Sequence, residues 1–188
     1  MHTDAAGGPA THADGMRVLV AASSKHGATR EIAAEIGSVL EDRGLDVLVM
    51  RLEDVFDVAG FDAYVLGSAV YAGRWMGEAR RFVDQHAAEL AERPTWLFSS
   101  GPIGDPPKPD EGSAVKLADA LAKTGAREHH LFSGRLDRRS LGLGERTVVR
   151  VVGAEDGDYR DWDDVRGWGA SIADALAAAS QRPFHGST

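Results

Sequence analysis

A short polar stretch near the start of the chain carries residue types that can hold a phosphate group. Its sequence is Ser24-Lys25-His26-Gly27-Ala28-Thr29, with a glycine between two hydroxyl side chains. The hydroxyls can donate hydrogen bonds, and a glycine lets the backbone fold closely around an anion. The stretch predicts a phosphate-binding loop. The alternative is a plain strand-to-helix turn in which Thr29 caps the helix.

The segments on either side of this stretch position it. Residues 16–22 form a short apolar run rich in β-branched residues, which is typical of a strand buried on both faces. After Thr29, apolar residues recur at helical spacing up to Gly44, which ends the helix: Ile32, Ile36, Val39 and Leu40. The first N–H groups of a helix lack partners within it, and its dipole is positive at that end. An anion held by the loop would therefore lie at a helix N-terminus.

Strands and helices continue to alternate along the chain. Apolar runs predict further strands over 45–50, 62–67, 95–99 and 127–132. Amphipathic segments predict three more helices, one carrying Phe82, Val83, His86 and Leu90, one carrying Val115, Ala118, Leu121 and Ala122, and the last over 162–179. This alternation favours an α/β fold, a three-layer α/β/α sandwich around a five-stranded parallel sheet in 2-1-3-4-5 order.

Two further loops fall where such a fold binds ligands. They follow the third and fourth predicted strands, over 68–77 and 99–104. Doubly wound sheets bind ligands beyond the carboxyl ends of their strands, at the point where the strand order reverses. We therefore expect these loops to meet the phosphate loop at one edge of the sheet.

The phosphate loop resembles that of flavodoxins, in which a hydroxyl residue, a spacer, a second hydroxyl residue, Gly, a spacer and a third hydroxyl residue follow one another. Here His26 replaces the middle hydroxyl. The chain is most similar to the menaquinone-dependent protoporphyrinogen oxidase group of flavodoxin-like proteins, over about residues 16–176. Besides Ser24, four segments carry this resemblance: Thr29-Arg30-Glu31-Ile32-Ala33, Gly67-Ser68-Ala69-Val70-Tyr71, Phe132-Ser133-Gly134-Arg135-Leu136 and Asp158-Tyr159-Arg160-Asp161-Trp162.

The resemblance implies a non-covalently bound flavin mononucleotide (FMN). The loop 24–29 would hold its phosphate, and the other two loops would hold the isoalloxazine ring. Tyr71 is the first candidate for stacking on the ring and Trp75 the second; the alternatives are an exposed loop aromatic for Tyr71 and packing on the following helix for Trp75. The expected FMN-binding residues are Ser24, Lys25, His26, Gly27, Ala28, Thr29, Ser68, Ala69, Val70, Tyr71, Ala72, Gly73, Trp75, Ser99, Ser100, Gly101 and Pro102.

Two functional classes share this scaffold, and the fold alone does not separate them. One is an FMN-dependent oxidoreductase that passes electrons from an organic substrate to a quinone, and the other is a small electron carrier that docks onto redox proteins. The resemblance favours the first, with protoporphyrinogen IX as the family's substrate. The charges expected near the flavin also favour it, because basic residues stabilise the anionic reduced flavin: Lys25, Arg74 and Lys108, against Glu78 and Asp105. A flavin-free interaction domain is a third hypothesis.

Residues 136–153 stand where the protoporphyrinogen oxidase group carries a long, apolar, membrane-seeking insert. The segment in this chain is shorter and includes two glycines and two arginines between Leu141 and Val152. It either presents an amphipathic face to a membrane surface or a partner, or packs on the domain as a sixth element.

No metal site is expected. His129 and His130 are neighbours on a predicted strand, so their side chains point to opposite faces. The acidic cluster over 155–164 lacks the spacing of a calcium loop and is more typical of a solvated, helix-starting face. Trp96, Trp162 and Trp168 are expected to pack in the core or on the sheet.

The composition disfavours several other classes. With 29 acidic and 21 basic residues, the formal charge of −8 argues against nucleic acid as a partner. The absence of Cys removes disulfides, thiolate nucleophiles and Cys-ligated clusters. No apolar run approaches the roughly 20 residues of a membrane-spanning helix. We expect one domain over 16–180, with a disordered leader over 1–15 and a flexible tail over 181–188, in a cytoplasmic protein.

Overall fold

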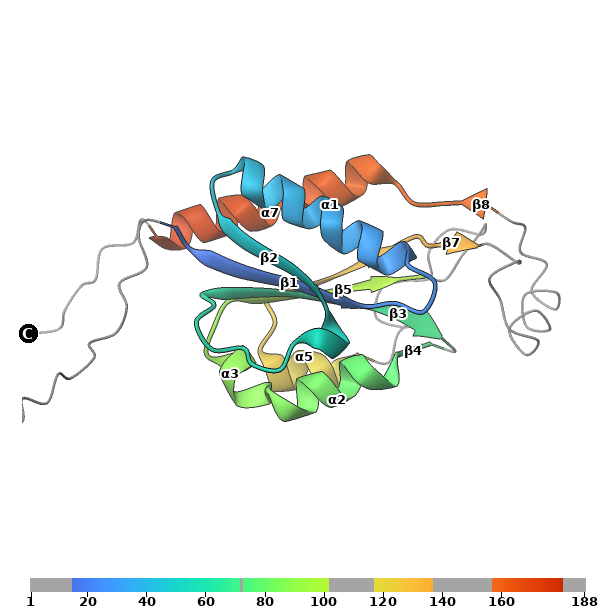
Figure 1. Cartoon of the computed structure of the whole chain (residues 1–188), viewed down its shortest axis with the longest axis horizontal. Helices are drawn as coiled ribbons and strands as arrows, with labels where there is room; N and C mark the ends of the chain where they lie inside the picture. Colours follow the sequence, from blue (N-terminus) through green and yellow to red (C-terminus); the bar gives the residue numbers. More distant parts are fainter. Residues whose placement is uncertain (1–14, 72, 102–116, 137–156, 181–188) are drawn as a thin grey trace, which may run out of the picture.

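Five parallel strands form the central sheet of the computed structural model, which describes residues 15–71, 73–101, 117–136 and 157–180 (Figure 1). The strands are β1 (Arg17–Ser23), β2 (Asp46–Arg51), β3 (Ala63–Tyr71), β5 (Thr95–Ser100) and β6 (Glu128–Phe132). Their spatial order is β2-β1-β3-β5-β6, with the two-residue strand β4 (Arg74–Trp75) paired to β3 outside this path. The predicted 2-1-3-4-5 order and the α/β/α sandwich are confirmed.

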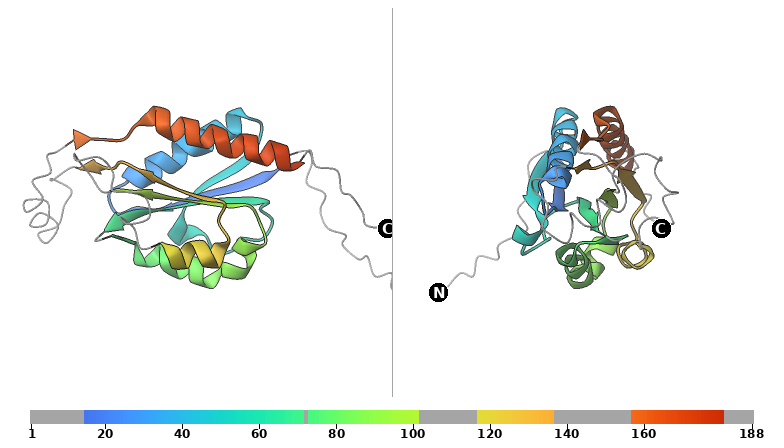
Figure 2. Two further views of the ribbon diagram at one scale, coloured as in Figure 1. Left: turned by 180° about the vertical axis from the view of Figure 1, so that it is seen from behind. Right: turned by 90° about the vertical axis from the view of Figure 1, so that its right-hand side faces the viewer.

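Helices cover both faces of the sheet. On one face lie α1 (Ala28–Asp42) and α7 (Trp162–Ser180), and on the other α2 (Gly77–Gln85), α3 (Ala87–Ala91) and α5 (Ala118–Thr124). The end-on view in Figure 2 shows the three layers. Each helical layer has its own apolar core against the sheet, one around Ile36 and Ile172 and the other around Phe82 and Leu90. Because both faces are covered, β1 is buried from Val18 to Ser23, which explains its continuous apolar run.

The register of the sheet brings the loops that were predicted to bind a ligand to one edge. Val20 of β1 pairs with Val49 of β2 and with Val65 of β3, and Gly67 of β3 pairs with Phe98 of β5. All five strands run in the same direction, so their carboxyl ends lie together. The segments that follow β1, β3, β5 and β6 consequently converge there.

The helix predicted around Phe82 and Leu90 is two helices. His86 separates α2 from α3 with φ −113° and ψ 18°, outside helical geometry. Its N–H still donates to the Phe82 carbonyl, and its carbonyl accepts the Leu90 N–H, both at 3.0 Å. The chain therefore changes direction at His86 while both apolar residues stay in the same core.

The segment predicted as a loop over 68–77 contains a β-hairpin. Strand β3 continues to Tyr71, and β4 returns antiparallel to it, with Val70 opposite Trp75 and Tyr71 opposite Arg74. Gly73 makes the turn with φ 70°, a left-handed conformation that favours glycine. The small and polar residues after Gly67 suggested a loop, whereas pairing with β4 and β5 extends the strand.

Two short strands complete the described structure besides the 3-10 turn η1 (Leu52–Asp54). They are β7 (Arg135–Leu136) and β8 (Gly157–Asp158), which pair antiparallel. The predicted leader up to residue 14, the tail over 181–188, the stretch 102–116 and the segment 137–156 lie outside the described residues, as does Ala72. Within the described part of the chain, no helix is long and apolar enough to cross a membrane.

Candidate functional site

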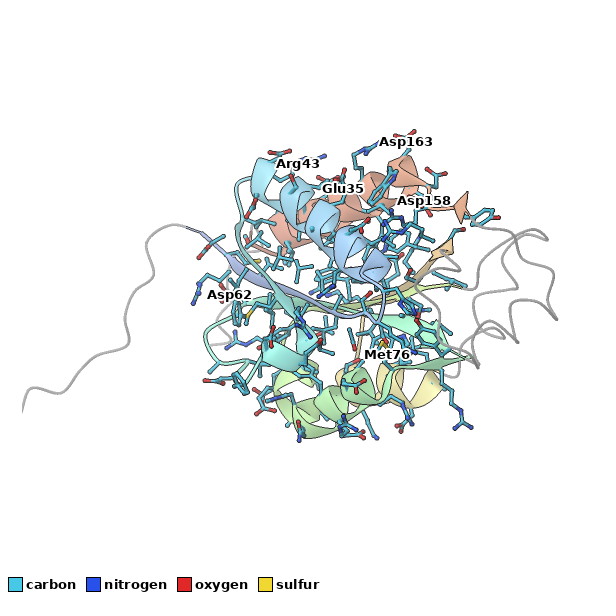
Figure 3. All side chains as sticks on the ribbon, turned by 45° about the vertical axis from the view of Figure 1, so that its right-hand side comes forward. Glu35, Arg43, Asp62, Met76, Asp158 and Asp163 are labelled. Carbon is cyan, nitrogen blue, oxygen red and sulfur yellow. The ribbon has the colours of Figure 1, made fainter. Side chains whose placement is uncertain are left out.

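A hollow of about 100 Å³ opens where β1, β3 and β5 end. Pockets that enclose a drug-sized ligand measure roughly 300–1,000 Å³, so the described residues by themselves would cover only part of a larger ligand. Figure 3 turns this edge of the sheet toward the viewer, with Asp158 and Met76 labelled on opposite sides of it. The described lining residues are Ser24, His26, Ala28, Thr29, Ala69, Val70, Tyr71, Ser100, Gly101, Gly134 and Arg135.

The predicted phosphate loop has the geometry of an anion site. Gly27 adopts φ 88° and ψ −22°, and its N–H donates to Ser24 Oγ at 3.0 Å. The first bond inside α1 runs from the Glu31 N–H to the Gly27 carbonyl at 3.0 Å, so three backbone N–H groups precede it, those of residues 28–30. Together with the hydroxyls of Ser24 and Thr29 they form a donor set suited to a phosphate group.

The β3–β4 hairpin supplies the second wall of the hollow. Ala69, Val70 and Tyr71 line it, and the Tyr71 residue is 38% exposed. Lys25 Nζ lies 5.9 Å from the centroid of the Tyr71 ring, so the phosphate loop and the hairpin are adjacent. The hairpin thus places an aromatic ring and apolar surface beside the predicted phosphate loop.

The end of β5 supplies the third wall. Ser100 and Gly101 line the hollow, and Gly101 has φ 104°. Its N–H donates to the Phe132 carbonyl at 3.0 Å, which ties the end of β5 to the end of β6. A side chain at this left-handed position would be strained, so the glycine defines how the chain leaves β5. Pro102, which was predicted to continue the site, lies outside the described residues.

Several predicted site residues lie beneath the hollow. Trp75 is 3% exposed and packs in the apolar core that α2 covers, which was the alternative to ring stacking. Its Nε1 donates to Ser99 Oγ at 2.8 Å, and Ser99 Oγ lies 2.8 Å from His129 Nε2. The buried Ser68 hydroxyl donates to the Ala69 carbonyl and accepts the Met76 N–H. These bonds hold the hairpin in place below the surface that a ligand would contact.

Two lining residues were not predicted, Gly134 and Arg135. They follow β6 and lie in a segment that carried the family resemblance, but no role in the site was expected for them. The signal was available in the topology, because the carboxyl end of the fifth strand lies at the same edge as those of the other parallel strands.

An ion-pair network connects this segment to the start of α1. Glu31 Oε2 accepts hydrogen bonds from Arg135 Nη1 at 3.0 Å and from Arg160 Nη1 at 2.6 Å. Arg160 also donates to both carboxylate oxygens of Asp158, at 2.8 and 2.6 Å. These hydrogen bonds lower the pKa of Asp158 and raise that of Arg160, since each charge stabilises the other.

The two histidines of β6 and the aspartates at the start of α7 make contacts within the fold. His130 Nε2 lies 3.1 Å from Asp164 Oδ1, while the neighbouring His129 contacts Ser99 on the other face of the sheet. Asp161 Oδ1 accepts the N–H groups of Asp163 and Asp164, so these three members of the acidic cluster lie at the start of α7. Asp158 instead lies in β8 and binds Arg160, and residues 155 and 156 lie outside the described residues. In the described ranges no group of three or more His, Asp and Glu is arranged to bind a metal ion.

Comparison with known proteins places the chain in a family. It is 24% identical over 178 residues to protoporphyrinogen IX dehydrogenase (quinone) of Escherichia coli K12, covering 84% of this chain and 95% of that protein. Its fold is similar to that of an archaeal flavodoxin, with TM-score 0.59 and 17% identity over 86% of this chain and 99% of the other. It also resembles rubredoxin:oxygen oxidoreductase of Desulfovibrio gigas, with TM-score 0.61 and 14% identity over 88% of this chain and 37% of that one. Residues 19–163, most of the chain, match the flavodoxin domain model, and the chain therefore belongs to the flavodoxin-domain family.

Proposed function

We propose that this chain binds FMN non-covalently at the hollow and acts as an FMN-dependent oxidoreductase with a quinone-type acceptor. The observation that carries the proposal is the convergence of a phosphate-type loop with the ends of β3 and β5 on one hollow. The hollow lies where the strand order reverses between β1 and β3, the position at which doubly wound folds bind their ligands. Membership of the flavodoxin-domain family supports the same cofactor.

The residues at the hollow fit the two ends of FMN. The hydroxyls of Ser24 and Thr29 and the N–H groups at the start of α1 would hold the phosphate. Tyr71 would stack on the isoalloxazine ring, and the backbone of β3 and β5 would meet its polar edge. The lining residues would contact FMN, Ser68, Trp75 and Ser99 would support the site through their buried hydrogen bonds, and Gly73 would make the turn of the hairpin.

FMN, when bound, supplies electron and hydride transfer through its ring. The chain itself sets the charge around that ring. Lys25 lies near Tyr71, and Arg74 stands opposite Tyr71 in the hairpin, while Glu78 in the first turn of α2 is the opposing charge among the described residues. Positive charge favours the anionic reduced flavin and raises the reduction potential, which suits an oxidoreductase better than a low-potential carrier. Lys108 and Asp105, expected near the ring, lie outside the described residues.

Similarity to the E. coli enzyme supports protoporphyrinogen IX as the electron donor and a quinone as the acceptor. The second candidate is a small electron carrier that docks onto redox proteins. The fold is compatible with it, because this chain matches an archaeal flavodoxin along 99% of that protein's length.

The test is to purify the full chain, remove any bound flavin and titrate it with FMN. We expect one FMN per chain, a midpoint potential above that of low-potential carriers, and oxidation of protoporphyrinogen IX that depends on added menaquinone. A chain that does not bind FMN would overturn the proposal. A chain that binds FMN at a strongly negative potential and does not oxidise protoporphyrinogen IX would favour the carrier.

A further inference from the structure

One arginine faces the hollow from the β6 side of the sheet. Arg135 lines the hollow, and its side chain is 34% exposed. Its Nη1 donates to Glu31 Oε2 at 3.0 Å. Among the lining residues that the structure describes, Arg135 carries the one permanent positive charge, because a guanidinium stays protonated at any working pH. A partly exposed side chain held by a single carboxylate oxygen can turn toward a ligand.

The negative charge of Glu31 would disfavour the binding of an anion at the start of α1. It lies in the first turn of α1, next to the N–H groups that would meet a phosphate. A carboxylate and a phosphate repel each other, and the repulsion is stronger at the protein surface than in bulk water. A second arginine offsets the carboxylate: Arg160 Nη1 donates to Glu31 Oε2 at 2.6 Å, and the Arg160 side chain is 3% exposed.

Arg160 is held in place by contacts that do not involve Arg135. Its Nε and Nη2 donate to the two carboxylate oxygens of Asp158, and its Nη1 also donates to the Ala28 carbonyl at 3.3 Å. Its guanidinium lies 4.5 Å from the centroid of the Trp162 ring. Arg160 can therefore neutralise Glu31 whether or not Arg135 remains paired with it.

We propose that Arg135 contacts the phosphate group of bound FMN, and that Arg160 is the positioning residue that keeps Glu31 neutralised when it does. The inference rests on the proposed function and adds to it a contact specific for a phosphate monoester. Riboflavin has the same ring and ribityl chain as FMN but no phosphate. The ratio of the two dissociation constants therefore isolates the phosphate contact from the rest of the site.

The first experiment measures both dissociation constants for the wild type, Arg135→Gln and Arg135→Lys. We expect Arg135→Gln to weaken FMN binding roughly tenfold to a hundredfold, as for the loss of a charge-assisted hydrogen bond, and to leave riboflavin binding within about twofold. Arg135→Lys keeps the charge and should retain most of the FMN preference. Arg166→Gln is the matched control, since Arg166 pairs with Glu35 of α1 and Asp163 of α7 away from the lining. It should change neither constant.

The second experiment tests the role of Arg160. Arg160→Gln should weaken FMN binding more than riboflavin binding, because it leaves the Glu31 carboxylate facing the phosphate. Adding Glu31→Gln to Arg160→Gln should restore FMN binding, which a purely structural role for Arg160 does not predict.

The outcomes separate this inference from the function on which it rests. Equal FMN binding by the wild type and Arg135→Gln, or an equal loss of FMN and riboflavin binding, would overturn the inference and leave the proposed cofactor in place. A folded wild-type chain that binds riboflavin as tightly as FMN would also overturn it. A folded wild type that binds neither flavin would overturn the inference and the proposed function together.

Discussion

Gly67 of β3 and Phe98 of β5 are paired in register, and the Phe98 ring occupies the space that a side chain on Gly67 would need. Phe98 is fully buried, and its ring meets Phe132 and Trp168 edge to face, with centroids 5.9 and 6.1 Å away. The absence of a Cβ on Gly67 therefore lets an aromatic cluster join β3, β5, β6 and α7 just below the carboxyl edge of the sheet. Gly67 is therefore needed for the aromatic packing just below the edge of the sheet at which the hollow opens.

Gly67→Ala should destabilise the protein. The new methyl group would overlap the Phe98 ring, which its aromatic neighbours prevent from moving aside. Overpacking of this kind costs about 1–3 kcal/mol of the free energy of unfolding, which urea denaturation would measure. In Gly167→Ala, on the exposed face of α7, the methyl group meets nothing within 4 Å. This control should stabilise the helix by up to about 1 kcal/mol. Equal stability of Gly67→Ala and the wild type would contradict the described ring position.

The fold was predictable because its signals are local and repeated. The run over 16–22 predicted β1, and the helical spacing after Thr29 with Gly44 at its end predicted α1, both within two residues of their observed bounds. The hairpin after Gly67 was not predicted, because its strand character comes from pairing with β4 and β5 rather than from its own composition. The break between α2 and α3 at His86 was not predicted either, because it depends on how the two helices pack against the same apolar core.

The candidate site likewise contains residues that a local sequence pattern indicated and residues that only the structure brings together. A phosphate loop could be predicted over 24–29 because strand, loop and helix are contiguous in the sequence. Trp75 could not be assigned from sequence, since the hairpin decides whether its indole faces the hollow or the core. Arg135 and Glu31 are 104 residues apart, and Arg160 and Glu31 are 129 apart, so no local pattern links them. Only the three-dimensional structure reveals the network at the start of α1.

Ser99→Ala should lower the free energy of unfolding by about 1–3 kcal/mol, because it leaves the buried Trp75 Nε1 without its acceptor and removes the contact of Ser99 Oγ with His129 Nε2. Trp75→Phe removes the donor along with part of the ring. Urea denaturation of both single variants and the double variant gives their coupling energy. If the two residues interact as described, the double variant loses less stability than the sum of the single variants. Strict additivity would show that the hydrogen bond contributes nothing to stability.

Asp158→Asn should reduce the dependence of stability on acid pH. Hydrogen bonding from Arg160 lowers the pKa of Asp158 in the folded state, so the unfolded chain binds more protons near the ordinary pKa of about 3.9. The contribution of Asp158 is therefore present above that pH and is lost as the pH falls through the lower, folded-state pKa. Urea denaturation from pH 7 downward should find Asp158→Asn less stable than the wild type at neutral pH, with the difference shrinking in acid.

The control for this titration is Asp174→Asn. Asp174 forms an ion pair with Arg43 at 2.7 Å, and both side chains are largely exposed. Removing such a pair changes stability by about 0–1 kcal/mol. A difference between Asp158→Asn and the wild type that stays constant down to the most acid pH would show that the variant disturbs β8 in some way other than through the charge of Asp158.

Tyr71→Ala should weaken the binding of FMN and riboflavin by the same factor, because the two flavins share the ring on which Tyr71 would stack. Loss of an aromatic contact costs about 0.5–1.5 kcal/mol beyond the lost burial, which corresponds to a factor of roughly two to twelve. Tyr71→Phe keeps the aromatic face and should bind both flavins nearly as the wild type does. Phe56→Ala removes an aromatic that is 90% exposed and absent from the lining, so it should have no effect. This result would differ from that expected for Arg135→Gln, which should weaken the binding of FMN and leave the binding of riboflavin nearly unchanged. If Tyr71→Ala instead binds both flavins as tightly as the wild type, the ring of Tyr71 does not contact the flavin and the hairpin contributes only its backbone and apolar surface.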